Sequence, residues 1–335
     1  MRVFVTGATG YLGGVLGKAL IAAGHEVVCL ARSSEKAEPL ERAGCRTVLG
    51  DLSDFATVDI DLAAFDAVVH SAALVKTKAA PAEFDRVNIE GVGAVAAQAL
   101  EAEVGVFLYT SSFMALGPAG VDGRPLDESA VHDPHHIHND YERTKYLGLL
   151  EFERWVERGL KGSALFPCVI YGPGELTSGN ITAQAIADII RGRLSGILGD
   201  GAQRWTYSYV DDVVAGHLAA LEKARPGRHY ILGGQTATMN EFAEMVARLA
   251  GVEAPKRHIP YWLAKVAALA EEARARISGA VPKLTREVVE VYKHHWAYSS
   301  GRAELELGYR TTPLEEGLAT TVAWIKAQID QGRLA

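Results

Sequence analysis

The stretch Thr6-Gly7-Ala8-Thr9-Gly10-Tyr11-Leu12-Gly13 decides the fold. It follows a short apolar run at 2–5 and precedes apolar residues at helical spacing. Glycines between a strand and a helix let the backbone approach a pyrophosphate, and the helix N-terminus supplies free N–H groups. The pattern also fits an ordinary strand-to-helix turn, but its position favours a dinucleotide site. The residues expected to form that site are Thr6, Gly7, Thr9, Gly10, Tyr11, Leu12 and Gly13.

Short apolar runs alternate with helical patterns in the first half of the chain. The runs typical of strands are 2–5, 26–30, 46–49, 67–70, 106–109 and 164–170. Each ends in a polar or small-residue turn, and ligands bind at this carboxyl edge of open parallel sheets. This predicts an α/β fold, with a Rossmann-like doubly wound parallel sheet and a smaller C-terminal α/β lobe. We expect 1–170 to bind the dinucleotide and 171–335 mainly the substrate, with some later segments returning to the first domain.

Length, charge and cysteine content limit the class of protein. The chain has 335 residues, enough for about two domains, and a net charge of −7 without a basic block, which argues against nucleic-acid binding. It opens without a signal-peptide pattern and has no run of about 18 apolar residues. Its three scattered cysteines fit a reducing compartment. We expect a cytoplasmic protein with a small-molecule substrate and without stable membrane insertion, and leave a homodimer open.

The residues that follow the second predicted strand indicate whether the cofactor is NAD or NADP. An acid there binds the ribose hydroxyls of NAD, whereas an arginine accommodates the 2′-phosphate of NADP. The sequence has Arg32 at this place and its first acid only at Glu35. Arg32 therefore favours NADP(H), with NAD(H) as the alternative. Arg32 could instead stack on adenine or face solvent.

A phenol and an ammonium group lie four residues apart in Tyr141-Glu142-Arg143-Thr144-Lys145, on one face of a helix predicted over 141–158. A neighbouring lysine and an oxidised nicotinamide both favour phenolate, so we expect a lowered pKa for Tyr141. Ser112, after strand 106–109, would hold a substrate oxygen against the phenol. The Tyr-x-x-x-Lys spacing alone also fits a solvated helix face.

Together these motifs resemble the extended short-chain dehydrogenase/reductases of the NAD-dependent epimerase/dehydratase superfamily. The matching segments, in family order up to about residue 215, are 6–13, Gly50-Asp51-Leu52, His70-Ser71-Ala72-Ala73, Val87-Asn88, Tyr109-Thr110-Ser111-Ser112, Tyr141 with Lys145, Pro167, Tyr171-Gly172-Pro173-Gly174 and Tyr209-Val210-Asp211-Asp212. The resemblance implies that Ser112, Tyr141 and Lys145 are catalytic and that Asn88 supports them. It also implies cofactor contacts for Asp51, Leu52, Ala72, Ala73 and Pro167.

Three further segments are similar to the dihydroflavonol-4-reductase-like branch, above all to plant farnesol dehydrogenases: Phe113-Met114-Ala115-Leu116-Gly117, Leu176-Thr177-Ser178-Gly179-Asn180 and Trp296-Ala297-Tyr298-Ser299. Those relatives are described as NAD-dependent although they also carry an arginine after the second strand. The resemblance implies hydride transfer between an apolar secondary or allylic alcohol and its carbonyl compound. Phe113, Met114 and Tyr171 would then contact the substrate.

Three alternatives remain beside this interpretation. A sugar-nucleotide epimerase would need an arginine where Trp205 stands, with Arg204 one position away. A non-catalytic NADP-sensing protein would commonly lack the tyrosine–lysine pair. The histidines between His132 and His138 suit a metal, but we expect no metal because a full ligand set is missing, and a loop over the substrate mouth instead. We expect the apolar helix at 260–277 to pack in the core or to form a lid over an apolar substrate.

Overall fold

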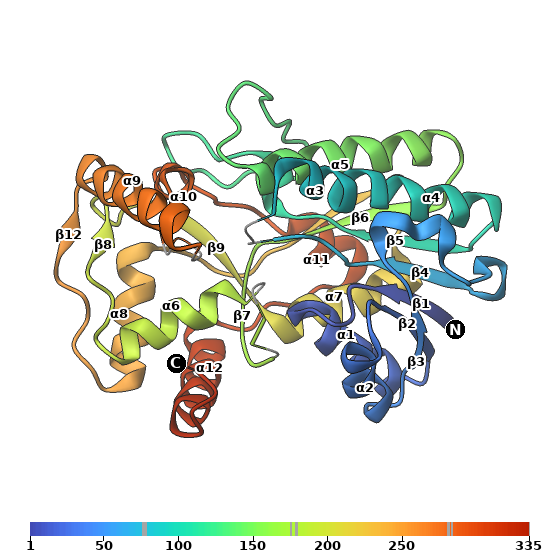
Figure 1. The fold of residues 1–335 in the computed structure, drawn as a ribbon, viewed down its shortest axis with the longest axis horizontal. Helices are drawn as coiled ribbons and strands as arrows, with labels where there is room; N and C mark the ends of the chain where they lie inside the picture. Colours follow the sequence, from blue (N-terminus) through green and yellow to red (C-terminus); the bar gives the residue numbers. More distant parts are fainter. Residues whose placement is uncertain (76–78, 175, 178–179, 280–281, 283, 335) are drawn as a thin grey trace.

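The computed structural model describes residues 1–334 except 76–78, 175, 178–179, 280–281 and 283. A large sheet with helices on both faces occupies one side of the molecule, and short strands with further helices occupy the other (Figure 1). The predicted α/β class is confirmed by this arrangement.

The large sheet consists of parallel strands in the order β3-β2-β1-β4-β5-β6-β10. Their bounds are β1 Arg2–Thr6, β2 Glu26–Ala31, β3 Arg46–Leu49, β4 Ala67–His70, β5 Val106–Thr110, β6 Gly162–Pro167 and β10 His229–Leu232. After β3 the chain crosses over to place β4 on the other side of β1. The strand order therefore reverses between β1 and β4, and a crevice at such a switch point is where ligands bind in sheets of this kind.

Both faces of this sheet are buried, because successive side chains along each strand point to opposite faces. Val3 and Val5 pack with Leu16 of α1 on one face, whereas Phe4 packs into the core that holds Phe152 on the other. The first face carries α1 (Tyr11–Ala22), α2 (Ser34–Arg42), α7 (Val210–Lys223) and α11 (Gly301–Leu307). The second carries α4 (Gly91–Glu101) and α5 (Asp140–Glu157), with α3 (Pro81–Asp85) beside them.

The smaller part is built mainly from segments after residue 168. A second sheet has the order β11-β9-β7, and β8 pairs with β12. Its strands are β7 Val169–Tyr171, β8 Ile197–Leu198, β9 Arg204–Tyr209, β11 Thr236–Thr238 and β12 His258–Ile259, and its helices are α6 Ile181–Ile190, α8 Met239–Ala250, α9 Tyr261–Ser278, α10 Arg286–Val291 and α12 Leu314–Asp330. Strand β10 and helices α7 and α11 come from this half of the sequence but pack on the large sheet. Short 3-10 turns cover Leu52–Thr57, Leu62–Ala64 and Phe113–Leu116.

The single strand predicted over 164–170 is wrong. Strand β6 ends at Pro167, which pairs with Leu232, and β7 begins at Val169, which pairs with Tyr207 of the second sheet. Proline has no N–H to continue the ladder of the large sheet. An apolar run interrupted by proline therefore serves two sheets.

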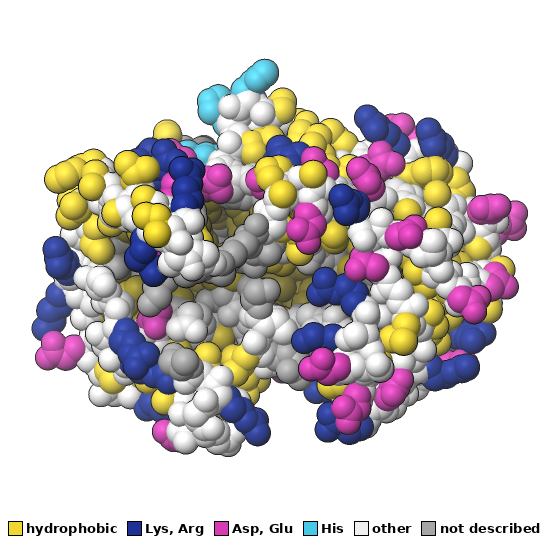
Figure 2. All heavy atoms as spheres, viewed as in Figure 1, with side chains coloured by type: hydrophobic (Ala, Val, Ile, Leu, Met, Phe, Trp, Pro, Cys, Tyr) yellow, Lys and Arg dark blue, Asp and Glu magenta, His cyan; other side chains and the backbone are white. Residues whose placement is uncertain are grey.

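The surface carries both signs of charge and one exposed apolar helix. Lysine, arginine, aspartate and glutamate side chains are interspersed on the face that Figure 2 shows, and hydrophobic atoms gather over α9. Trp262, Val266 and Leu269 of α9 are exposed, whereas its small residues Ala264 and Ala268 are buried. Among the helices that the structure describes, none has the length and apolarity needed to cross a bilayer.

Candidate active site

The turn after β1 has room for backbone only. Gly7 has a φ of +80°, and a Cβ on it would lie 2.5 Å from the backbone nitrogen of Ala72. A Cβ on Gly13 would overlap the carbonyl oxygen of Gly7. No side chain in the described part of the chain caps α1, whose N-cap residue is Gly10. The N–H groups that open α1 are thus available to a ligand, and the residues present fit a pyrophosphate.

The neighbouring strand end closes this turn from the other side. Ala72 follows β4, and its backbone N–H lies 3.4 Å from Oγ1 of Thr6. The Thr6 hydroxyl is also 3.0 Å from Nδ1 of buried His70, whose pKa falls to about 3 because of burial and the nearby charge of Lys145. Ala73 is partly buried next to Ala72. Thr6, Gly7 and Ala72 therefore meet at the switch point between β1 and β4.

Other predicted cofactor residues surround the start of α1. Tyr11 is buried and donates its hydroxyl to the carbonyl of Gly172 at 2.8 Å, which ties α1 to the turn after β7. Leu12 is buried in the core under this helix, and Thr9 is partly buried in the turn. Pro167 is buried at the end of β6. The ends of β1, β6 and β7 therefore contribute to one edge of the molecule.

The strand ends beyond β1 bring together a cation and an acid. Arg32 is exposed directly after β2, and Asp51 is exposed after β3, followed by buried Leu52. Partial burial opposes ionisation of Asp51, but hydrogen bonds from Ser53 and the charge of Arg32 outweigh it and lower the pKa of Asp51. The two predicted adenosine-side residues are thus close enough to interact.

Ser112 and Tyr141 meet at the carboxyl end of β5. Ser112 is buried and caps the 3-10 turn Phe113–Leu116, accepting from the N–H of Met114 at 3.3 Å. Tyr141 lies in the first turn of α5, close enough to Ser112 for the serine hydroxyl to favour the phenolate form of Tyr141. The structure brings this predicted pair together from segments 29 residues apart in the sequence.

Lys145 lies one helical turn after Tyr141 and is buried. Its ammonium group donates to the carbonyl of Thr110, the last residue of β5, at 3.1 Å. It also lies 5.4 Å from the ring centre of Tyr109. Burial lowers the pKa of Lys145 to about 7. The lysine therefore ties α5 to the end of β5 and is only partly charged at neutral pH.

The expected lowering of the Tyr141 pKa is not found in the protein alone. Burial raises the pKa of Tyr141 to about 12, and the nearby Ser112 hydroxyl opposes this rise. Desolvation of the phenol is the larger of the two effects. This expectation omitted the cost of burying both groups.

Asn88 links three segments around this pair. It lies in a π-helical turn, Arg86–Glu90, between α3 and α4, a kind of irregularity that is frequent at functional sites. Its amide oxygen accepts from the N–H of Leu74 at 2.7 Å, and its amide nitrogen donates to the carbonyl of Leu74 and to Oγ1 of Thr144, both at 3.0 Å. The predicted supporting residue thus joins the loop after β4 to α5. Thr144, which lies inside the Tyr141–Lys145 motif, was missed as its partner.

The predicted substrate residues fall into two groups. Phe113 and Met114 are buried directly after Ser112, and the Phe113 ring lies 5.5 Å from that of Trp296 and 5.6 Å from that of Tyr298. Tyr171 is buried against Tyr209, at 5.5 Å, and against Gly317 of α12. Phe113 and Met114 therefore belong to the Ser112 side of the site, whereas Tyr171 packs towards α12.

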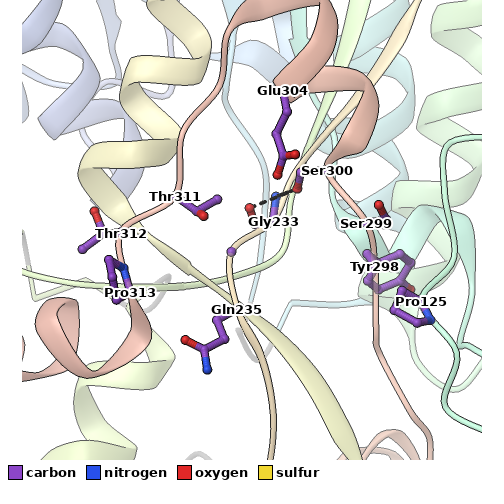
Figure 3. A pocket seen from close by; sticks show the side chains of 11 residues that line it. Pro125, Gly233, Gln235, Tyr298, Ser299, Ser300, Glu304, Thr311, Thr312 and Pro313 are labelled. Carbon is purple, nitrogen blue, oxygen red and sulfur yellow. Dashed lines mark hydrogen bonds between the residues drawn. The ribbon is translucent and has the colours of Figure 1, made fainter.

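A polar pocket of about 510 Å³ lies at the end of β10 (Figure 3). Ser300 exchanges hydrogen bonds with the backbone of Gly233 there, and Gln235, Thr312 and Tyr298 also line it. Tyr298 contacts Phe113 as well and donates its hydroxyl to the carbonyl of Gly117 at 2.5 Å. The pocket thus shares one wall residue with the Ser112 side of the site.

The histidine-rich loop engages a residue that the sequence interpretation overlooked. His132 and His138 both bind Glu142, the residue after Tyr141, at 2.8 and 3.0 Å. Among the described residues, no group of three or more histidines, cysteines and acids is placed to hold a metal ion. The spacing Asn139-x-x-Glu142 was the available signal, because an acid at this place turns back on the helix N-terminus.

Comparison with known proteins agrees with this geometry. A model of the NAD dependent epimerase/dehydratase family matches residues 3–233. A Synechocystis protein named "Putative dihydroflavonol 4-reductase" is 27% identical, with 96% of this chain and 94% of that protein covered. A 4-hydroxy-2-methyl-3-oxo-4-farnesyl-3,4-dihydroquinoline-1-oxide ketoreductase of Stigmatella aurantiaca is 31% identical, with 92% of each covered. The crystal structure of gox2253 is 30% identical with a TM-score of 0.84, covering 100% of this chain and 99% of that one.

The fold and the site define an extended short-chain dehydrogenase/reductase. The chain belongs to the NAD dependent epimerase/dehydratase family, whose model matches most of its length. The resemblance predicted from the motifs is confirmed at the level of the family.

The burial of Lys145 predicts a pH-dependent stability. A lysine that titrates near 7 when folded and near 10.5 when unfolded binds fewer protons in the folded state between these values, so raising the pH stabilises the fold. From about pH 7 to about pH 9, the free energy of unfolding of wild type should rise by about 2–3 kcal/mol relative to that of Lys145→Met. This follows from roughly 1.4 kcal/mol per pH unit for one proton. Urea denaturation of both proteins at both pH values measures this. If the free energies of unfolding of wild type and Lys145→Met differ by the same amount at both pH values, the lowered pKa of Lys145 is contradicted.

Proposed function

We propose that the chain is an NAD(P)-dependent oxidoreductase that interconverts an apolar secondary or allylic alcohol and its carbonyl compound. The observation that carries this proposal is the placement of Tyr141 beside Ser112 and next to buried Lys145, at the sheet edge that also holds the Gly7 turn. Its three free cysteines, all buried, agree with a cytoplasmic enzyme.

In this proposal the protein groups move one proton and hold the reacting oxygen. When bound, oxidised nicotinamide supplies the hydride acceptor and a positive charge that favours the Tyr141 phenolate. Tyr141 takes the hydroxyl proton as the alcohol becomes a carbonyl, and returns it in the reverse direction. Ser112 holds the substrate oxygen against the phenol. Lys145 holds the ribose and adds to the positive potential at the phenol.

The cofactor is held by backbone more than by side chains. Gly7, Gly10 and Gly13 allow close approach to the pyrophosphate, and the N–H groups in the first turn of α1 would donate to it. Asp51 and Leu52 border the adenine, and Ala72, Ala73 and Pro167 line the path to the nicotinamide.

The substrate class follows from what surrounds Ser112. The four residues after it, 113–116, are all buried and apolar. The Stigmatella relative is named for a ketone that carries a farnesyl chain, which supports an apolar ketone or alcohol here. An acid–base pair for water elimination, Asp-Glu in family dehydratases, is replaced by Phe113 and Met114.

A sugar-nucleotide epimerase is the second candidate, because the family includes epimerases. Trp205 is buried in β9, whereas Arg204, the first residue of the strand, is exposed. The Trp205 indole donates to the carbonyl of His294 at 3.2 Å and lies 4.9 Å from the ring of Tyr292. An inward arginine that could clamp a diphosphate is therefore replaced by an indole at this position. A sensing protein without turnover, the third candidate, would not need the buried Tyr141–Lys145 pair.

The substrate class is tested by a chain-length series of prenyl and alkyl alcohols, followed by nicotinamide absorbance. Each buried methylene contributes about 0.8 kcal/mol, so we expect kcat/KM to rise nearly fourfold per methylene until the apolar wall is filled. UDP- and dTDP-sugars should bind weakly in the same assay. A flat response to chain length with micromolar binding of a nucleotide sugar would instead favour the epimerase.

For the cofactor we propose a preference for NADP(H), with NAD(H) as a usable alternative. Arg32 is exposed where the 2′-phosphate would lie, and no acid precedes Glu35 after β2. The charge of Arg32 contributes to the lowered pKa of the neighbouring Asp51, which supports a role for Arg32 on the adenosine side.

Replacement of this arginine tests the preference. Arg32→Ala should weaken NADP(H) binding by about 1.5–3 kcal/mol, the range for a hydrogen bond to a charged group, and leave NAD(H) nearly unchanged. Arg42→Ala is a matched control, since Arg42 is equally exposed at the other end of α2. Calorimetric titration of wild type and both variants with NADP(H) and with NAD(H) measures these affinities. Equal affinity of the wild type for NADP(H) and NAD(H) would show that Arg32 does not discriminate.

A further inference from the structure

A fully buried carboxylate lies one residue after Tyr141. The Glu142 side chain is 0% exposed. Its Oε1 accepts from Nε2 of His132 at 2.8 Å, and its Oε2 accepts from the backbone N–H and from Nδ1 of His138, both at 3.0 Å. These bonds outweigh the effect of burial and lower the pKa of Glu142, so it is ionised. A buried carboxylate without such partners would cost several kcal/mol.

His132 completes a buried ion pair. Its ring is also 0% exposed, and its Nδ1 lies 2.9 Å from the carbonyl oxygen of Asp133. A carbonyl oxygen and an ionised carboxylate can only accept hydrogen bonds. Both ring nitrogens of His132 must therefore donate, which only the imidazolium form can do.

The cluster fixes the start of α5, where Tyr141 lies. Asn139 caps this helix by accepting from the N–H of Glu142 at 2.8 Å. The Glu142 carboxylate turns back and holds His138, the residue before the cap. Tyr141 lies between the cap residue and Glu142, so its backbone is held on both sides.

The same cluster reaches the apolar wall beside Ser112. The ring of His138 lies 4.3 Å from that of His294 and 6.3 Å from that of Trp296. Trp296 in turn packs edge-on against Phe113 at 5.5 Å. Ring contacts thus run continuously from the start of α5 to the residue that follows Ser112.

We propose that Glu142, together with His132 and His138, is a positioning set that holds Tyr141 against Ser112 and fastens the segment 127–139 beside the apolar wall. This rests on the proposed function, because it makes Glu142 act through Tyr141. The set explains why a histidine-rich loop precedes the helix: two of its histidines neutralise and orient one buried carboxylate. His135 and His136 of the same loop are exposed and take no part.

The test compares Glu142→Gln with wild type in two measurements. Glu142→Gln keeps the size of the side chain and removes its charge, which leaves the His132 imidazolium without a counterion. Hydrogen exchange should become at least tenfold faster for the amides of 127–146, and kcat should fall at least tenfold. The dissociation constant of NADP(H) should stay within twofold, because the Gly7 turn is not touched. His135→Ala, the matched control, should match wild type in all three readouts.

Two further variants separate positioning from simple loss of stability. If the set acts as a unit, His132→Gln combined with Glu142→Gln should lower kcat no further than Glu142→Gln alone, since the double variant leaves no unpaired charge. His138→Ala keeps the ion pair intact and should still lower kcat severalfold. It serves as the decisive variant if Glu142→Gln does not fold.

The outcomes distinguish this proposal from the proposed function. A Glu142→Gln or His138→Ala protein that melts earlier but keeps kcat within twofold of wild type would overturn the positioning role. Unchanged exchange of 127–146 would overturn it as well. If wild type turns over no alcohol or carbonyl compound while exchange changes as expected, the oxidoreductase assignment fails and the structural coupling stands.

Discussion

The burial of one ammonium group is the constraint on which the site depends. Lys145 gives up its hydration to reach the carbonyl of Thr110, and its pKa falls to about 7 as a consequence. That contact fixes the distance between α5 and the end of β5, so it also sets where Tyr141 stands relative to Ser112. Asn88 and Glu142 hold the same helix from two other directions, through Thr144 and through the cap at Asn139. A helix fixed at so many points suits a reaction that needs two oxygen atoms in register.

The sheet supplies the rest of the arrangement. Seven parallel strands end at one edge, and their order reverses between β1 and β4. The backbone of Gly7 lies against that of Ala72 at this reversal, so the dinucleotide turn and the strand end that faces it are a single structure. Strand β5 is the next strand after β4, so Ser112, which follows β5, lies beside this turn at the carboxyl edge of the sheet. The pyrophosphate turn and Ser112 are thus placed by strand order, whereas Tyr141 is brought to Ser112 by α5, which follows a long loop.

The sequence predicted much of this fold, because parallel strands buried on both faces are continuous apolar runs. Strands 46–49 and 67–70 match the structure residue for residue. The run 164–170 did not, since one proline moved the chain from one sheet to another. The predicted site residues meet at one edge because motif spacing encodes strand ends. Glu142, Thr144 and the π-helical turn at Asn88 escaped prediction, since Glu142 binds His132 from 10 residues away and Thr144 binds Asn88 from 56 residues away. The rise in the Tyr141 pKa in the protein alone could not be predicted, because burial depends on tertiary packing.

The central claim is that Tyr141 transfers the proton in a nicotinamide-dependent reaction. Pre-steady-state turnover of Tyr141→Phe with the best alcohol or carbonyl substrate tests it most directly, beside Tyr146→Phe, a change one turn further along the same helix. General acid–base catalysis contributes about two to four orders of magnitude, so Tyr141→Phe should lose that much of the hydride-transfer rate. It should also bind NADP(H) within twofold of wild type, and Tyr146→Phe should behave like wild type. A Tyr141→Phe protein that transfers hydride at the wild-type rate would contradict the account.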